Sequence, residues 1–294
     1  MPVRVSAISF LNPAPLLYNF EHEPVATELR TRYDVHYTTP ARCAAELHAG
    51  EADLGLIPIA QLTRELAVVP GCTIASLEEV RSILLLVRFR GTMSQDNVLG
   101  GIRSIAADNA SRSSAAYVRT LLRRFYRNDP SLLEEAANPV TMLAEHDAAL
   151  LIGDHALLAR ERRASIDDEV FRASGDRLLW LDLARLWRQH TGLPWVAAVW
   201  AVRPEALAGT GVSAAQLAAD LNSSRDAGLA HTEEIVARWL PRLPLSAETI
   251  RTYLTRNIYY KLDEPCLEAI RTFRAMAAEE SVLPELPMLN MLQT

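Results

Sequence analysis

Side chains suited to binding a polar or anionic ligand are found in four stretches of this 294-residue chain. In the first, residues 9–15 (SFLNPAP), Asn12 can donate and accept hydrogen bonds and precedes a proline that can open a helix. The amino-terminus of a helix offers free N–H groups and the positive end of the helix dipole, which favour an anion. The alternative is that Asn12 caps the helix and touches no ligand, and residue chemistry alone favours that alternative.

The second stretch leads into an amphipathic helix that the apolar spacing predicts over residues 112–127. Ser111, Ser113 and Ser114, together with the free N–H groups of the helix start, form a generic site for a carboxylate or phosphate. Arg112 places a cation in the first turn, against the helix dipole, and a bound anion would explain it. A solvated arginine that tolerates this small cost is the alternative.

The third stretch is a predicted strand-to-helix corner at residues 56–60 (LIPIA), without a charged side chain. Ile57 and Pro58 can offer backbone groups and an apolar wall for a ring, although simple packing is the alternative. Its possible counterpart contains Gly153, which allows close backbone approach, and Asp154, which can cap the next helix.

The fourth stretch is residues 80–86 (VRSILLL). Ser82 opens an apolar strand there, so its hydroxyl could face a cleft or bond to the backbone at a strand edge. His155, next to Asp154, could serve as a base, but a histidine on a helix face is the commoner outcome.

The chain has no glycine-rich phosphate loop, no GxSxG elbow and no HExxH motif. No pair of its seven histidines has the spacing of metal ligands. Residue chemistry alone therefore predicts an anion-binding protein of undefined activity.

Strands and helices alternate along the first sixty residues, which is typical of a parallel sheet covered by helices. Further strands and one long helix follow, and the chain beyond Pro204 is predicted to be helical, with a loosely packed end. The predicted strands are 3–9, 34–38, 54–57, 73–77, 82–87, 104–107, 148–152, 177–181 and 196–202, and the late helices are 214–222, 232–240, 247–257 and 265–278.

A faint internal repeat favours two lobes. Residues 50–58 (GEADLGLIP) and 145–153 (EHDAALLIG) each follow a predicted helix and place an aspartate, Asp53 or Asp147, just before a strand. Any two strand–helix units share such features, so chance similarity is an equally weighted alternative. A true repeat would place two α/β lobes around a cleft, with ligand at the carboxyl ends of the strands.

Bulk composition indicates a soluble globular protein, with 49% hydrophobic and 22% charged residues. A net charge of −6 does not favour nucleic acid as a partner. Asn12 and two prolines interrupt the apolar N-terminal stretch, which lacks the features of a secretory signal, and no window predicts a membrane span. The three isolated cysteines predict neither a disulfide framework nor a metal site. Together these features predict a cytoplasmic protein.

An ordered set of motifs resembles the chorismate dehydratases, the first enzymes of the futalosine route to menaquinone. The resemblance covers nearly the whole chain, and the order of the motifs is more specific than any one of them. They are residues 8–16 (ISFLNPAPL), 50–59 (GEADLGLIPI), 81–85 (RSILL), 111–114 (SRSS), 148–154 (AALLIGD), Asp182, Trp187, 191–195 (TGLPW) and 198–203 (AVWAVR).

The resemblance implies the fold of the type-two periplasmic binding proteins, an α/β fold with two lobes and a ligand cleft between them. Lobe one would comprise residues 1–87 plus 201–294, and lobe two residues 88–200. It also implies that chorismate loses water to give 3-[(1-carboxyvinyl)oxy]benzoate, with no metal or organic cofactor and with the substrate's own side-chain carboxylate as base.

By the same resemblance, Asn12 and Ser82 match the family's functional asparagine and serine. Asn12 would orient the leaving hydroxyl or the enolpyruvyl carboxylate, and Ser82 would bond to a substrate carboxylate. Residues 111–114 would lie at an anionic group of the substrate.

Two other functions stay open. The dihydroxynaphthoate synthase of the same pathway shares the fold, but its Cys-Pro-Asn-Asp-type run is absent here. A non-catalytic cytoplasmic ligand-binding protein is the second. The sequence does not indicate the oligomeric state.

Overall fold

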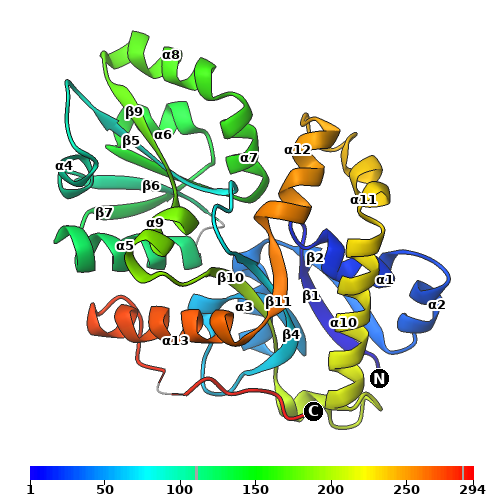
Figure 1. Cartoon of the computed structure of the whole chain (residues 1–294). Helices are drawn as coiled ribbons and strands as arrows, with labels where there is room; N and C mark the ends of the chain where they lie inside the picture. The colour runs from blue at the N-terminus through cyan, green and yellow to red at the C-terminus, as the bar shows by residue number, and fades with distance from the viewer. Residues whose placement is uncertain (110–111, 287) are drawn as a thin grey trace.

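The protein is built on two β-sheets, each covered by helices (Figure 1). The computed structural model describes residues 1–109, 112–286 and 288–294. In the first sheet, β1 pairs in parallel with β2 and β3, and β10 runs antiparallel between β3 and β4. The sheet has the order β11-β4-β10-β3-β1-β2, with β1 Val3–Ile8, β2 Tyr33–Thr38, β3 Leu54–Pro58, β4 Ala67–Ser76, β10 Trp195–Val202 and β11 Tyr259–Leu262.

The second sheet repeats this plan. Strand β6 pairs in parallel with β7 and β8, and β5 runs antiparallel between β8 and β9. Its order is β7-β6-β8-β5-β9, with β5 Ile83–Phe89, β6 Ser104–Asp108, β7 Ser131–Glu135, β8 Ala148–Ile152 and β9 Arg177–Asp182. The sequence β2-β1-β3-β10-β4 of the first sheet therefore corresponds strand for strand to the whole second sheet.

The internal repeat is confirmed in detail by two aspartates. Asp53, before β3, accepts a hydrogen bond from the backbone N–H of Arg4 at 3.0 Å and from its guanidinium. Asp147, before β8, accepts the same bonds from Arg103, with the backbone N–H at 2.9 Å. A second arginine reaches each carboxylate: Arg203, which directly follows the antiparallel strand β10, at 3.0 Å, and Arg88 of the antiparallel strand β5 at 3.9 Å.

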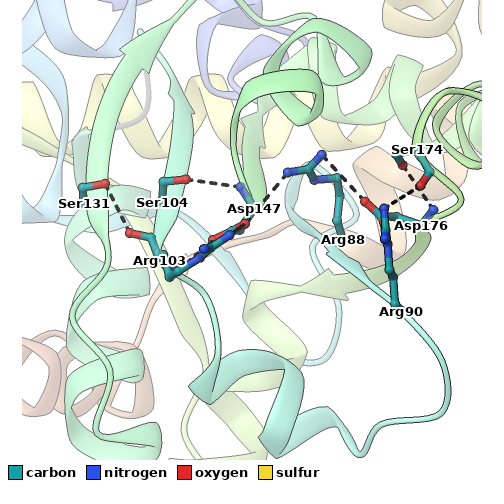
Figure 2. A network of polar contacts seen from close by, with 8 residues as sticks. All are labelled: Arg88, Arg90, Arg103, Ser104, Ser131, Asp147, Ser174 and Asp176. Carbon is teal, nitrogen blue, oxygen red and sulfur yellow. Dashed lines mark hydrogen bonds and ion pairs between the residues drawn. The ribbon is translucent and has the colours of Figure 1, made fainter.

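We call these two groups the aspartate clamps. Figure 2 shows the clamp of the second lobe, where Arg88 lies between Asp147 and Asp176 and Arg90 joins the same network. Each clamp ties three neighbouring strands together at the end where the parallel strands begin.

The chain crosses between the lobes at points that differ from the expected boundaries. Strand β5 pairs in the second sheet, so residues 83–87 do not belong to the first lobe. Strand β10 pairs in the first sheet, so residues 195–200 do not belong to the second. In each lobe the antiparallel strand comes directly after the chain has crossed from the other lobe. Because an apolar strand sequence does not indicate which sheet the strand joins, these boundaries could not be predicted from the sequence.

Helices cover both sheets and meet between the lobes. Helix α13 of the first lobe packs against α5 of the second, where Phe273 stacks on Tyr117 with ring centroids 3.7 Å apart. Among the described residues, no helix is long and apolar enough to cross a membrane. The α-helices are α1 Tyr18–Glu21, α2 Val25–Leu29, α3 Pro40–Ala49, α4 Gln95–Gly100, α5 Arg112–Tyr126, α6 Pro139–Glu145, α7 Gly153–Glu161, α8 Arg163–Ser174, α9 Leu183–Thr191, α10 Ala214–Ala230, α11 Thr232–Trp239, α12 Ala247–Thr252 and α13 Glu264–Glu279. Shorter turns are the 3-10 helices η1 Ala14–Leu17, η2 Ile59–Gln61 and η3 Pro204–Leu207, and the π-helix η4 Tyr253–Asn257.

The end of the chain is held to the first sheet, contrary to the expectation of loose packing. The N–H of Val68 donates to the carbonyl of Asn290 at 2.8 Å, and the N–H of Leu292 donates to the carbonyl of Val68 at 2.9 Å. These bonds extend the pairing of β4 beyond β11.

Candidate functional site

A cavity of about 480 Å³, including its open mouth, lies between the two lobes. Both sheets contribute to its wall, and so does the crossover between β4 and β5 that contains Ser82. The lining residues are Ile8, Phe10, Asn12, Pro40, Pro58, Ile74, Ser82, Ile83, Ser114, Ile152, Gly153, Ala197 and Ala198.

The cavity lies at the carboxyl ends of parallel strands. Strand β1 ends at Ile8, β3 at Pro58 and β8 at Ile152, and all three residues line the wall. This is the edge at which ligands bind in open α/β sheets. The aspartate clamps lie at the opposite ends of the same strands.

Three helices begin at the cavity wall. Helix α3 starts at Pro40, α7 starts at Gly153, and the first turn of α5 contains Ser114. None of the described lining residues carries a charged side chain. Because helix amino-termini present free N–H groups and a partial positive charge, this wall attracts anions through its backbone.

Asn12 lies between β1 and η1, with its side-chain Oδ1 buried and without a hydrogen-bond partner among the described residues. The main-chain carbonyl oxygen of Asn12 accepts a hydrogen bond from the hydroxyl of Tyr260 at 2.9 Å. Helix η1 has no side-chain cap, so the capping role favoured by residue chemistry is wrong. A buried amide oxygen without a donor costs about 1–3 kcal/mol. A ligand donor in the cavity would satisfy it.

Ser82 lies immediately before β5 and is 1% exposed. Its Oγ accepts a hydrogen bond from the hydroxyl of Tyr253 at 2.8 Å, and its carbonyl accepts one from the N–H of Gly153 at 2.7 Å. The preceding Arg81 has a φ of 63°, in the left-handed region, and its N–H donates to Asp182 at 2.7 Å. Asp182 therefore holds the turn that presents Ser82 to the cavity.

Gly153 makes a close contact between the lobes. Its φ is 56°, and a Cβ at this position would lie 2.7 Å from the ring of Phe10. Phe10 of the first lobe thus packs directly on the backbone of the second. Only glycine provides both the conformation and the space.

The next two residues are polar. Asp154 Oδ1 accepts a hydrogen bond from the N–H of Leu11 at 3.1 Å, again between lobes. Burial raises the pKa of Asp154 to about 6. His155 is half-exposed, with Nδ1 3.0 Å from Asp108, whose carboxylate raises the pKa of the imidazole. His155 is not part of the cavity wall.

Comparison with known proteins agrees with this architecture. A family model described as menaquinone biosynthesis matches residues 3–279. The chain belongs to the menaquinone-biosynthesis family. A chorismate dehydratase from Thermus thermophilus is 28% identical to this family member over 262 residues, which cover 87% of this chain and 89% of the relative.

Solved structures similar to this menaquinone-biosynthesis protein show the periplasmic-binding-protein fold. One is the alkanesulfonate-binding protein SsuA from Xanthomonas axonopodis pv. citri, bound to MOPS, with a TM-score of 0.62 at 14% identity. The match covers 97% of this chain and 94% of that one. A Candida albicans protein described as having the generic periplasmic binding protein fold has a TM-score of 0.62 at 13% identity, with 100% of this chain and 98% of that one covered. The expected two-lobed α/β fold is confirmed.

Five of the seven candidate residues whose side chains the structure describes lie at the cavity of this menaquinone-biosynthesis protein. Asn12, Pro58, Ser82, Ser114 and Gly153 line it together. Two others do not form its wall: Ile57 is fully buried in the core behind Pro58, and Asp154 contacts the backbone of Leu11 instead. Ser111 lies outside the described residues, as do the side chains of Arg112 and Ser113.

Three aromatic residues of the site are not marked by any pattern in the sequence. Phe10 lies inside the first motif, two residues before Asn12, and an apolar side chain at that position is typical of a core. Tyr253 falls in the predicted helix 247–257 and Tyr260 lies between that helix and the next, 171 and 248 residues from the residues that they contact. No local pattern predicts such contacts.

Proposed function

We propose that this member of the menaquinone-biosynthesis family is a hydro-lyase that converts chorismate to 3-[(1-carboxyvinyl)oxy]benzoate and water. The observation that carries the proposal is Asn12 at the wall of a cavity where three helices begin, with a buried Oδ1 that has no hydrogen-bond partner among the described residues. Chorismate has two carboxylates for the helix termini and a ring hydroxyl for the amide oxygen. The chorismate dehydratase from Thermus thermophilus, 28% identical, supports the same substrate. We assign the enzyme to the cytoplasm, without a nucleic-acid or membrane partner.

The reaction is an elimination that keeps all electrons within the substrate. A base removes the proton from the ring carbon that bears the enolpyruvyl ether, and the C–H electrons form the new ring double bond. The neighbouring C–O bond breaks, and the hydroxyl leaves as water after taking up a proton. Conjugation to the ring carboxylate stabilises the carbanion, and aromatisation drives the reaction forward. No cofactor is required by this balance.

The cavity residues have distinct roles in this scheme. Asn12 Oδ1 accepts a hydrogen bond from the ring hydroxyl, which orients the leaving group, and its amide N–H faces the enolpyruvyl carboxylate. Ser82 donates to a substrate carboxylate. The start of α5, with Ser111, Arg112, Ser113 and Ser114, binds an anionic group, and Pro58 and Gly153 bound the ring.

The base is the substrate's own side-chain carboxylate. The described lining residues include no histidine, aspartate or glutamate, which supports this assignment. A carboxylate bound only by neutral donors keeps more of its basicity than one paired with a cation, because a nearby positive charge lowers its pKa.

The test is incubation of the purified protein with chorismate, without added metal or cofactor, followed by mass spectrometry. Loss of one water with formation of the aromatic enolpyruvyl ether is the expected result. A naphthalene product from a later pathway substrate would indicate the dihydroxynaphthoate synthase instead. Binding of unchanged chorismate would indicate a non-catalytic binding protein. A protein that does not bind chorismate and does not convert it would overturn the proposal.

A further inference from the structure

A buried tyrosine near the end of the chain contacts the serine of the cavity. Tyr253 begins η4, directly after α12, and its Oη lies 2.8 Å from Ser82 Oγ. Each of the two residues is 1% exposed. The hydrogen bond therefore forms away from bulk water, where a lost partner is not replaced by solvent.

The hydrogen bond has a definite direction. A phenol is a much stronger acid than an aliphatic hydroxyl, so Tyr253 donates and Ser82 accepts. Burial raises the pKa of Tyr253, which keeps it a neutral donor. With one lone pair of Ser82 Oγ occupied by Tyr253, the single hydroxyl proton of Ser82 is left for another acceptor.

The segment that carries Tyr253 is fixed in place. The N–H of Ile258 donates to the carbonyl of Tyr253 at 3.1 Å, a bond that spans five residues and defines a π turn. Such turns are frequent at functional sites. In the same turn, the amide of Asn257 donates to the carbonyl of Glu79 at 3.1 Å. Two bonds thus join η4 to the crossover that ends at Ser82.

We propose that Tyr253 is a positioning residue that directs the hydroxyl proton of Ser82 into the cavity, toward an anionic oxygen of the ligand. This inference rests on the proposed function, under which that oxygen belongs to a carboxylate of chorismate. Without the phenol, the Ser82 hydroxyl can rotate away from the ligand, and the carboxylate loses a donor that was oriented before binding.

The test replaces Tyr253 with phenylalanine and uses a tyrosine of the same segment as a matched control. Tyr259 donates to Asp263 at 2.6 Å, so its hydroxyl does not touch the cavity. Tyr253→Phe is expected to raise the KM for chorismate about 3- to 10-fold, the effect of one hydrogen bond, with kcat changed less than twofold. Tyr259→Phe is expected to leave KM unchanged.

A double-mutant cycle separates positioning from packing. In a Ser82→Ala background, Tyr253→Phe is expected to change KM less than twofold, because the group that it orients is already gone. An equal loss in both backgrounds would overturn the inference. So would a Tyr253→Phe protein that fails to fold, since the hydroxyl would then support the fold and not the site.

The outcomes also distinguish the two proposals. Wild-type protein without turnover overturns the proposed function, and this inference with it. Wild-type turnover with an unchanged KM in Tyr253→Phe or in Ser82→Ala overturns the positioning role alone.

Discussion

At the scale of single residues, the cavity combines neutral polar groups with backbone N–H groups. Tyr253 donates to the side-chain hydroxyl of Ser82, Tyr260 donates to the main-chain carbonyl of Asn12, and both Ser82 and Asn12 line the cavity. The hydroxyl of Ser82 and the backbone of Asn12 are therefore held in place before a ligand arrives. Preorganised donors and acceptors of this kind cost no rearrangement during reaction.

Replacing Asn12 by alanine should separate function from stability. We expect kcat for chorismate to fall about 100-fold, as on loss of one oriented polar group in an active site. The thermal midpoint should stay the same or rise, because the variant removes a buried oxygen that has no donor among the described residues. Steady-state kinetics and thermal unfolding check both parts. Near-normal turnover in a folded variant would exclude Asn12 from catalysis.

Asp154 should make stability depend on pH. Burial raises its pKa to about 6 in the folded protein. The folded state then binds the proton more tightly than the unfolded chain, so this stability is present below the unfolded pKa near ~4 and is lost as pH rises through 6. Asp154→Asn keeps an oxygen for the N–H of Leu11 but cannot ionise. Its advantage in thermal midpoint over wild type should be larger at pH 7.5 than at pH 5, and an equal or smaller advantage would contradict the assignment.

At the scale of elements, apolar runs predicted the central strands well. Strands β3 and β8 are buried at every position, and their continuous apolar sequences mark them clearly. Strand β7 was missed because it is a partly exposed edge strand with the sequence SLLEE. Strand β11 was missed because it has only four residues, which follow a π turn in the short gap between the predicted helices 247–257 and 265–278.

The candidate site was predicted only in part for a related reason. Family resemblance pointed to Asn12 and Ser82, whereas the local chemistry of Asn12 favoured a helix cap. Local chemistry cannot distinguish a cap from a ligand contact, since both require a polar side chain before a helix. The partners of these residues depend on how distant segments pack, which no spacing encodes.

The junction of β8 and α7 should be sensitive to a single methyl group. Gly153→Ala would add a Cβ 2.7 Å from the Phe10 ring, whereas Gly175→Ala, at a similar φ of 75°, would meet no atom within 4 Å. Both variants carry the left-handed cost of about 1–2 kcal/mol. Only Gly153→Ala should also weaken chorismate binding, because it moves Phe10 at the cavity wall. Equal thermal midpoints and equal KM values for the two variants would contradict this contact.

At the scale of the whole molecule, the two ends of each sheet have different tasks. The carboxyl ends of the parallel strands form the cavity, and the aspartate clamps fasten the opposite ends about 15 Å away, the length of a five-residue strand. Asp53 and Asp147 occupy equivalent places in the two lobes (Figure 2 for the second). The repeated plan thus keeps strand pairing independent of the site between the lobes.

The clamps should therefore affect stability without affecting the reaction. Asp53→Asn and Asp147→Asn are each expected to lower the free energy of unfolding by about 1–3 kcal/mol, with chorismate KM and kcat changed less than twofold. Asp53→Asn should cost more, because the side chain of its partner Arg4 is 46% exposed and that of Arg103 is 86% exposed.

The stability that the aspartate clamps contribute should depend on pH. Burial opposes ionisation of Asp53, but its bonds to Arg4 outweigh that effect and hold the pKa of the carboxyl below its ordinary value. Bonds to Arg103 likewise lower the pKa of Asp147. Stability from a lowered carboxyl pKa is present above the unfolded pKa and is lost as pH falls through the folded one. The stability deficit of both variants should therefore shrink between pH 6 and pH 3 in thermal unfolding. A deficit that is constant with pH would mean that the clamps act through shape and not through charge.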